Sequence, residues 1–133
     1  MFIYKKKILF GDCDPGGILF YANIFKYFHE AYERFIESFE KYENHFYNKE
    51  IAFPLVHAEA DYKSPLFAGK EIEVRISVLE IKAHSFSIIY EVYEGDKKSV
   101  TGKTVHVCID YSGKKQALNE NLRWNLEKFK ENK

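Results

Sequence analysis

The strongest candidate for a chemical site is a short turn that carries two carboxylates. The seven residues Gly11–Gly17 contain three glycines and one proline around Asp12 and Asp14, a composition typical of a turn. Asp14 precedes Pro15, which disfavours a helical backbone at that position. The turn leads into a segment with a helical pattern, and helix N-termini offer free N–H groups and a partial positive charge. We therefore expect the Asp14 carboxylate to stay ionised at neutral pH.

An ionised carboxylate in this place has two interpretations. It can act as a nucleophile or as a base toward water, and it does not suit a general acid. Alternatively, Asp14 only fixes the turn through an Asx-type hydrogen bond to the backbone. The spacing of the residues does not separate these alternatives.

The neighbours of Asp14 also have alternative roles. Gly16 and Gly17 either allow a ligand to approach the backbone closely or provide a positive φ. Asp12 is predicted to be a turn or surface acid. Cys13 is a candidate nucleophile, but its two flanking carboxylates are expected to raise the pKa of the thiol and suppress the thiolate.

The histidines could serve as ligands or bases. No pair has the spacing of a zinc site, so no metal is expected. His29 stands next to Glu30, about two turns into the helical segment, where it either points toward a ligand or presents a polar edge. The sequence contains no serine nucleophile elbow and no Walker-type phosphate loop. The five histidines are His29, His45, His57, His84 and His106.

Hydrophobic periodicity predicts the elements that position this turn. Before it, apolar residues of one parity predict a strand that starts at Phe2 and ends at Gly11. After it, apolar residues recur at spacings of three and four and predict a helix over 22–39. The apolar face of this helix is so broad that other elements must cover it. Its members are Ile24, Phe25, Phe28, Ala31, Tyr32, Phe35, Ile36 and Phe39.

Four further strands are predicted after the helix, without another helix between them. Alternating residues place them around 56–62, 72–81, 86–92 and 105–109, with a change of phase at Leu79 that suits a bulge. Asn119 is predicted to cap a short terminal helix. The fold class is therefore α+β, a curved antiparallel sheet wrapped around one long helix. Because one helix covers only part of such a sheet, we expect association through a strand edge or a sheet face.

Size and charge exclude several classes of protein. The 133 residues suit a single domain over 1–133, and 20 basic residues balance 20 acidic ones, unlike the surface of a nucleic-acid-binding protein. No stretch approaches the ~20 apolar residues of a membrane span, and the order of apolar and basic residues at the N-terminus does not suit a secretory signal. Cys13 and Cys108 form no disulfide framework, so a reducing cytoplasm is expected. The run Lys5–Lys7 is expected to be solvated, or alternatively to anchor a ligand's phosphates.

The run from Phe10 to Phe35, FGDCDPGGILFYANIFKYFHEAYERF, resembles the opening of the 4-hydroxybenzoyl-CoA thioesterase family of hotdog-fold enzymes. The shared features are an Asp-x-Asp, a small-residue turn, an apolar pair, an aromatic residue and an asparagine before an aromatic-rich helix. In this chain they are Asp12, Asp14, Gly16, Gly17, Ile18, Leu19, Tyr21 and Asn23. The resemblance continues more loosely through 54–57, 62–66 and 85–86, and it covers most of the chain.

This resemblance implies a hotdog fold and the hydrolysis of an acyl-CoA thioester, without a cofactor. It implies that Asp14 is the catalytic carboxylate, as nucleophile or as general base, and that a backbone N–H near Tyr21 polarises the thioester carbonyl. Family members form homodimers, often pair into homotetramers, and place their active sites at the subunit interface. The implied substrate-binding residues near the turn and on the helix are Gly16, Gly17, Asn23 and His29.

The resemblance also bears on the substrate. Many general acyl-CoA members place Glu where this chain has His29, and the stretch 29–33 is similar instead to the subgroup that hydrolyses 1,4-dihydroxy-2-naphthoyl-CoA. Ser85 and Phe86 are implied to flank the pantetheine arm of CoA, and Lys82 or Lys103 either reach its phosphates or are simply solvated.

Two alternative functions remain at this point. One is an acyl-carrier-protein thioesterase, and the other is a non-catalytic acyl-binding module. Hydration of enoyl thioesters is not expected, because Leu19 stands where a dehydratase of this fold has His.

Overall fold

One long helix forms the centre of the molecule. The computed structural model describes residues 1–131, and helix α1 spans Asn23–Glu37, which confirms the predicted helix to within two residues at each end. Its buried side chains recur at helical spacing, so most of the apolar face that the sequence predicts is the face that packs. They are Ile24, Tyr27, Phe28, Ala31, Tyr32, Phe35 and Ile36. Phe25, predicted on this face, is exposed instead, and Tyr27 is buried. Burying each large apolar side chain contributes about 1.5–3 kcal/mol.

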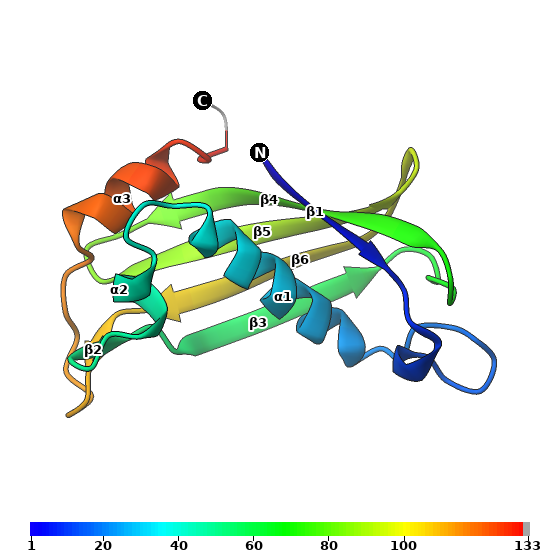
Figure 1. Cartoon of the computed structure of the whole chain (residues 1–133), viewed down its shortest axis with the longest axis horizontal. Coiled ribbons are helices and arrows are strands. Elements are labelled where there is room, and N and C mark those ends of the chain that lie inside the picture. The colour runs from blue at the N-terminus through cyan, green and yellow to red at the C-terminus, as the bar shows by residue number, and fades with distance from the viewer. Residues whose placement is uncertain (132–133) are drawn as a thin grey trace.

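A five-stranded antiparallel sheet covers this helix. Its order is β1-β4-β5-β6-β3, and α1 runs across one face of it (Figure 1). The expected α+β architecture is therefore confirmed. The strands are β1 (Phe2–Lys7), β3 (Leu55–Tyr62), β4 (Glu71–Ile81), β5 (Ser85–Glu94) and β6 (Lys97–Val107).

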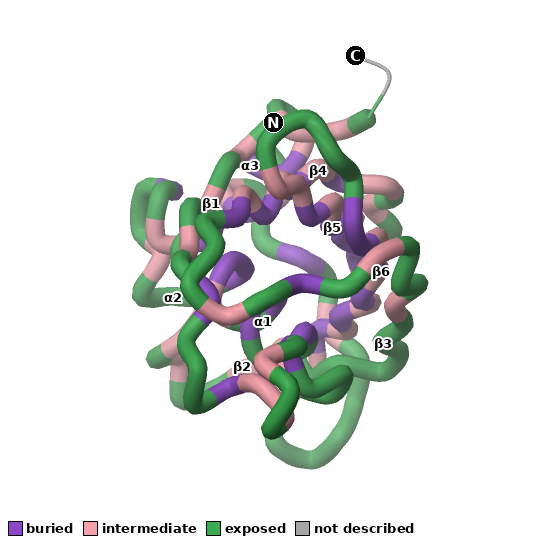
Figure 2. Tube along the Cα trace, turned by 90° about the vertical axis from the view of Figure 1, so that its right-hand side faces the viewer, coloured by how far each residue is buried: buried purple, intermediate pink, exposed green. Residues whose placement is uncertain are grey.

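Side chains alternate along the central strands as the sequence predicts. In β4, Ile72, Val74, Ile76 and Val78 are buried while the residues between them are not. The register of β4 against β5 shifts between Val78 and Glu80, which confirms the bulge expected at Leu79. Figure 2 shows the buried positions concentrated where the sheet faces α1.

Several boundaries differ from the prediction. β1 ends at Lys7 and is followed by a short 3-10 helix, η1 (Phe10–Asp12). The sequence predicts a strand that reaches Gly11 because Ile8 and Phe10 share its parity, but neither residue belongs to it. The last long strand begins at Lys97, and its predicted end is a separate short strand, β7 (Ile109–Asp110), which pairs with β2 (Ile51–Ala52).

Two short helices complete the chain. α2 (Glu43–Phe46) was not foreseen from the sequence, because a single turn carries little periodicity. α3 (Glu120–Glu127) begins where expected, since the side chain of Asn119 accepts a 2.7 Å hydrogen bond from the N–H of Leu122.

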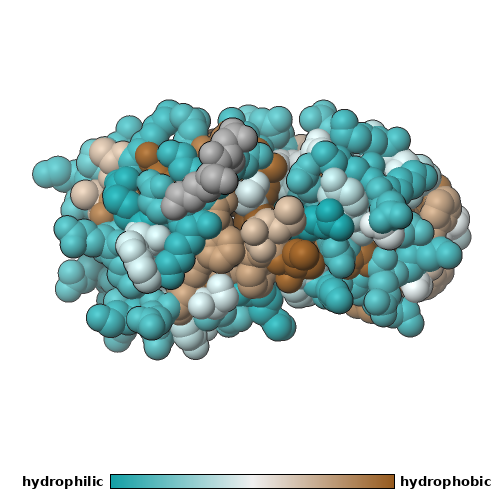
Figure 3. Space-filling model, turned by 90° about the horizontal axis from the view of Figure 1, so that it is seen from above, coloured by the Kyte–Doolittle hydropathy of each residue, from teal (hydrophilic) through white to brown (hydrophobic). Residues whose placement is uncertain are grey.

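Strand β3 is an edge strand of the sheet. Within residues 1–131 it pairs with β6 alone, and all of its residues except Ala60 are exposed, as the tube in Figure 2 shows. Its exposed side chains include Leu55, Val56 and Tyr62. From above, apolar side chains also gather in the middle of an otherwise hydrophilic face (Figure 3). Among residues 1–131, no helix is long and apolar enough to cross a membrane.

Candidate active site

The Asp14 carboxylate closes the turn that precedes α1. Its Oδ1 accepts hydrogen bonds from the N–H groups of Gly16, at 2.9 Å, and Ile18, at 3.1 Å. The N–H of Asp14 bonds the carbonyl of Ile18 at 2.8 Å, and Gly17 N–H bonds the carbonyl of Asp14 at 2.9 Å. The expected Asx-type contact is therefore present. It uses one carboxylate oxygen, and Oδ2 has no hydrogen-bond partner within residues 1–131.

The donors to Asp14 correct one expectation. We expected the N-terminus of α1 to stabilise this carboxylate, but both donors belong to the turn itself. Helix α1 begins at Asn23 without a side-chain cap. The turn therefore holds Asp14 independently of the helix, which leaves the helix start available for another acceptor.

The two glycines of the turn have different reasons to be glycine. Gly17 has a φ of 82°, in the left-handed region that glycine enters without strain. Gly16 has no such φ, but a Cβ at this position would lie 3.3 Å from Asp14 Oδ1. Gly16 thus keeps the space beside the carboxylate open, while Gly17 allows the chain to turn.

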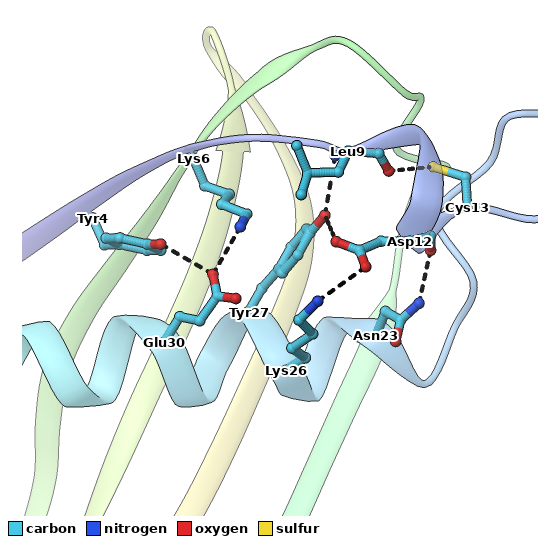
Figure 4. Close-up of polar contacts among 9 residues, drawn as sticks. All are labelled: Tyr4, Lys6, Leu9, Asp12, Cys13, Asn23, Lys26, Tyr27 and Glu30. Carbon is cyan, nitrogen blue, oxygen red and sulfur yellow. Dashed lines mark hydrogen bonds and ion pairs between the residues drawn. The ribbon is translucent and has the colours of Figure 1, made fainter.

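Asp12 is buried rather than being the surface acid that we predicted. Its carboxylate accepts a hydrogen bond of 2.8 Å from the hydroxyl of Tyr27 and one of 3.0 Å from Lys26 (Figure 4). Burial alone would raise the pKa of the Asp12 carboxyl. The hydrogen bonds from Tyr27 and Lys26 outweigh burial and lower that pKa, so the group is ionised at neutral pH.

The main-chain carbonyl of Asp12 connects the turn to the residues at the start of α1. It accepts the N–H of Phe20 at 3.0 Å. The same carbonyl accepts the side-chain amide of Asn23 at 2.8 Å (Figure 4). Leu19 N–H bonds the carbonyl of Leu66, which ties the loop to the sheet side as well. The side chain of Asn23 thus helps to hold the loop that carries Asp14, and its implied contact with substrate stays a prediction.

A second polar group lies farther along the same helix. Glu30 forms an ion pair of 3.0 Å with Lys6 and accepts a hydrogen bond of 3.0 Å from the hydroxyl of Tyr4 (Figure 4). The Lys6 ammonium also lies 4.9 Å from the centre of the Tyr27 ring. Lys6 is therefore paired and largely shielded from solvent, whereas Lys5 and Lys7 are exposed as expected for solvated residues. These partners were missed from the sequence. The sequence does contain a signal for them, because Asn23, Tyr27 and Glu30 are spaced by four and three residues and so share one face of the helix.

The start of α1 presents unpaired N–H groups. Within residues 1–131, the N–H groups of Tyr21 and Ala22 have no hydrogen-bond acceptor. The next N–H, of Asn23, bonds the carbonyl of Phe20 at 2.9 Å, and the hydroxyl of Tyr62 donates to the carbonyl of Tyr21. An exposed pair of N–H donors at a helix start is a suitable place for an oxyanion.

A hollow of about 380 Å³ adjoins this helix start. It shares Ile18 with the Asp14 turn and Tyr21 with the unpaired N–H groups, and it is mostly apolar. A volume of this size is within the range of small-molecule sites. Its wall is formed by Ile18, Leu19, Tyr21, Tyr62, Lys63, Ser64, Pro65, Leu66 and Val100.

A smaller hollow of about 80 Å³ lies between α1 and strands β3, β5 and β6, with the exposed His29 in its wall. The buried Thr104 hydroxyl below it bonds Tyr90 at 2.8 Å and His106 at 3.0 Å. Burial lowers the pKa of His106 to about 3, so its ring is neutral at pH 7. The remaining wall is aromatic or apolar and includes Phe25, Phe28, Tyr32, Leu55 and Ala58.

Ser85 and Phe86 lie at the other end of the sheet. They start β5, opposite the end of β4, whereas the beginning of β4 pairs with Lys7 near the Asp14 turn. β4 has 11 residues, which corresponds to about 35 Å. One chain thus does not bring them together with Asp14. Phe86 is 1% exposed and packs in the core, and the implied contact of both residues with pantetheine stays a prediction.

The remaining candidate residues are Lys82, Lys103 and Cys13. Lys82 lies near Glu80, at 3.9 Å, between β4 and β5, and Lys103 stands opposite Glu59 in the β3–β6 pair. Burial and the carboxylates of Asp12 and Asp14 raise the pKa of the Cys13 thiol, as expected, which disfavours this residue as a nucleophile. Within residues 1–131, no three His, Cys, Asp or Glu side chains are grouped as a metal site.

Known proteins share both the sequence and the fold of this chain. A 1,4-dihydroxy-2-naphthoyl-CoA hydrolase from Nostoc punctiforme is 35% identical over 126 residues, which cover 92% of this chain and 85% of that protein. The crystal structure of a 1,4-dihydroxy-2-naphthoyl-CoA thioesterase from Synechocystis matches with a TM-score of 0.87 at 27% identity and covers 94% of each chain. A gentisyl-coenzyme A thioesterase matches with a TM-score of 0.84 at 26% identity, over 93% of this chain and 98% of the other. Residues 8–126 match the model of the thioesterase-like superfamily, so the chain belongs to this superfamily and has its hotdog fold.

Proposed function

We propose that this protein hydrolyses an aromatic acyl-CoA thioester to a free carboxylic acid and CoA. The observation that carries the proposal is that, within residues 1–131, Asp14 Oδ2 and the N–H groups of Tyr21 and Ala22 have no hydrogen-bond partner, and that the hollow lined by Ile18 and Tyr21 joins the Asp14 turn to the start of α1. A thioester carbonyl needs a nucleophile and a donor to its developing oxyanion, and this site offers both.

The reaction can be assigned to named atoms. If Asp14 attacks the thioester carbon, the C–S bond breaks to give an acyl-aspartyl anhydride and CoA thiolate, and water then hydrolyses the anhydride. If Asp14 instead takes a proton from the attacking water, the hydroxide adds to the carbon and the C–S bond breaks directly. In both routes the water supplies the proton that converts the thiolate to the CoA thiol. The N–H of Tyr21 polarises the carbonyl oxygen, and one such donor contributes about 3–4 kcal/mol to the transition state. Gly16 leaves room for the substrate beside the carboxylate. Both mechanisms give the same products, a carboxylate and free CoA.

An aromatic acyl group suits the surroundings of the site. The larger hollow has the rings of Tyr21 and Tyr62 in its wall, and the smaller one has Phe25 and Phe28 beside His29. Flat rings pack well against such side chains. The relatives that are named for 1,4-dihydroxy-2-naphthoyl-CoA and gentisyl-coenzyme A act on aromatic acyl groups, which supports the same substrate class here.

A homodimer through β3 would combine the two hollows into one site. Two copies related by a twofold axis pair this edge strand antiparallel. The Tyr62 end of one strand, beside its own Tyr21, would then approach the Leu55 end of the other, where His29 of the partner subunit stands. The exposed edge of β3 supports this arrangement. Two such dimers could form a homotetramer.

The cytoplasm is the proposed location. Cys13 and Cys108 are both free thiols in the structure, which suits a reducing compartment.

A panel of thioesters tests the proposed function. Purified protein is incubated with aliphatic, benzoyl and hydroxynaphthoyl CoA thioesters, and the released thiol is measured with a colorimetric reagent. We expect turnover with the aromatic thioesters, at higher kcat/KM than with the aliphatic ones. The same acyl group on a carrier protein provides the comparison for a carrier-protein thioesterase. Calorimetric binding of acyl-CoA without thiol release would contradict the proposal and indicate a binding module.

A further inference from the structure

Tyr62 connects the edge strand to the main chain at the start of α1. It is the last residue of β3, and its hydroxyl donates to the carbonyl of Tyr21. Both rings lie in the wall of the larger hollow. Partial burial and the neighbouring Tyr21 raise the pKa of the Tyr62 hydroxyl, so the group stays protonated and keeps donating near neutral pH.

The contact has a geometrical consequence for the unpaired N–H groups. In a trans peptide the N–H points away from the C=O, so a partner on the carbonyl also fixes the direction of the N–H. Asn23 N–H holds the Phe20 carbonyl at 2.9 Å, and thereby directs the N–H of Tyr21. Tyr62 holds the Tyr21 carbonyl, and thereby directs the N–H of Ala22.

The helix alone would hold the second peptide poorly. Apart from Tyr62, the partner of the Tyr21 carbonyl is the N–H of Ile24 at 3.4 Å, which is at the weak end of the hydrogen-bond range. No side chain caps α1 among the described residues. A hydrogen bond to a peptide carbonyl also polarises that peptide and strengthens its N–H as a donor.

We propose that Tyr62 is a positioning residue for thioester hydrolysis, whose hydroxyl holds the Tyr21–Ala22 peptide so that the N–H of Ala22 stays directed at the oxyanion as a second donor beside the N–H of Tyr21. This inference rests on the proposed function. It assigns to the edge strand a role in the reaction as well as in packing. The hydroxyl acts through the peptide and does not itself touch the reacting atoms.

The substitution Tyr62→Phe tests this role because it keeps the ring in the wall and removes only the hydroxyl. We expect kcat with an aromatic acyl-CoA to fall about tenfold, the usual effect of losing one hydrogen bond, while KM changes less than about twofold, because the oxyanion exists only in the transition state. The melting temperature is expected to stay close to that of the wild type. Tyr111→Phe is the matched control, since the hydroxyl of Tyr111 donates to the main-chain carbonyl of Asn48, away from this site, and this variant should keep the wild-type kcat.

A spectroscopic measurement separates this role from a general loss of packing. In an Asp14→Asn background the thioester persists long enough for infrared spectroscopy with a ¹³C-labelled carbonyl. Donors at the helix start lower the carbonyl stretching frequency, so adding Tyr62→Phe should raise it toward its value in water.

The outcomes distinguish this inference from the proposed function. If the wild type releases no thiol from any acyl-CoA, the proposed function fails. If the wild type is active and Tyr62→Phe keeps its kcat and carbonyl frequency, only the role of Tyr62 is wrong. A raised KM at unchanged kcat would also overturn the inference, because it would mean that the hydroxyl binds the ground state.

Discussion

The hydroxyl of Tyr27 on α1 donates a 2.8 Å hydrogen bond to the buried carboxylate of Asp12, two residues before Asp14. Lys26, the preceding residue of the helix, donates to the other oxygen of the same carboxylate at 3.0 Å. The segment that carries the candidate catalytic carboxylate is thus attached to the central helix by a buried, charged contact (Figure 4). Such contacts define a position more sharply than apolar packing does.

Asp12→Asn should destabilise the protein and reduce turnover together. The amide removes the negative charge that Lys26 pairs with and places N–H donors beside a tyrosine hydroxyl and an ammonium. We expect a loss of about 1.5–3 kcal/mol in the free energy of unfolding, measured in urea. Tyr27→Phe, which removes one hydrogen bond and keeps the ring, should lose about 1 kcal/mol. Equal stability of Asp12→Asn and the wild type would show that this contact does not hold the loop.

Stability should fall as the pH drops from 7 to 5. Burial lowers the pKa of His45 to about 4 and that of His106 to about 3, whereas the unfolded chain binds these protons near pH 6.5. Below pH 6.5 the unfolded state therefore binds more protons, and each histidine removes up to about 1.4 kcal/mol of stability per pH unit. Urea unfolding at pH 7, 6 and 5 measures this slope. His106→Gln should flatten it, and a slope unchanged by that substitution would contradict the assignment.

Gly102→Ala should weaken the contact between α1 and the sheet. A Cβ at Gly102 would lie 2.2 Å and 2.5 Å from atoms of the Phe28 ring, and this ring is stacked on Tyr90 at 4.4 Å, so it has little room to move. We expect a loss of about 1–3 kcal/mol in the free energy of unfolding. Gly11→Ala is the control, because a Cβ there meets nothing within 4 Å. Comparable stability of both variants would mean that the helix can shift at no cost.

Association through β3 predicts the effect of a charge on this strand. Val56 is 61% exposed in the single chain, and a dimer through β3 would bury it or bring it close to the other copy. We expect the wild type to sediment as a dimer or larger, and Val56→Lys to shift the equilibrium toward the monomer with loss of turnover. A control substitution, Tyr47→Lys, at a residue that follows α2 and is 70% exposed, should leave the mass unchanged. A monomeric and fully active wild type would exclude a site shared between subunits.

The sequence predicts the long elements because their periodicity is local. The buried face of α1 and the alternation in β4 are repeated over many residues, so each position supports the next. The same rule misled at the end of β1, where Ile8 and Phe10 fit the strand parity but lie beyond the last strand residue, Lys7, with Phe10 in η1. The single turn of α2 carries too few residues for any period.

The candidate site could be predicted only in part, for a physical reason. The Asp-x-Asp and glycine turn identify Asp14 because turn chemistry is encoded by neighbouring residues. The burial of Asp12 depends on Lys26 and Tyr27, 14 and 15 residues away, and the contact of Tyr62 with Tyr21 spans 41 residues. Such contacts arise from the packing of separate elements, which local spacing does not contain.

The turnover of Asp14→Asn tests the central claim most directly. The substitution keeps an oxygen that can accept the N–H groups of Gly16 and Ile18, so the turn and the melting temperature should be retained. Thiol release from an aromatic acyl-CoA at saturating substrate is compared with that of the wild type. We predict that kcat falls by about 10²- to 10⁴-fold with little change in KM. A folded Asp14→Asn variant with the wild-type kcat would show that this carboxylate takes no part in the reaction.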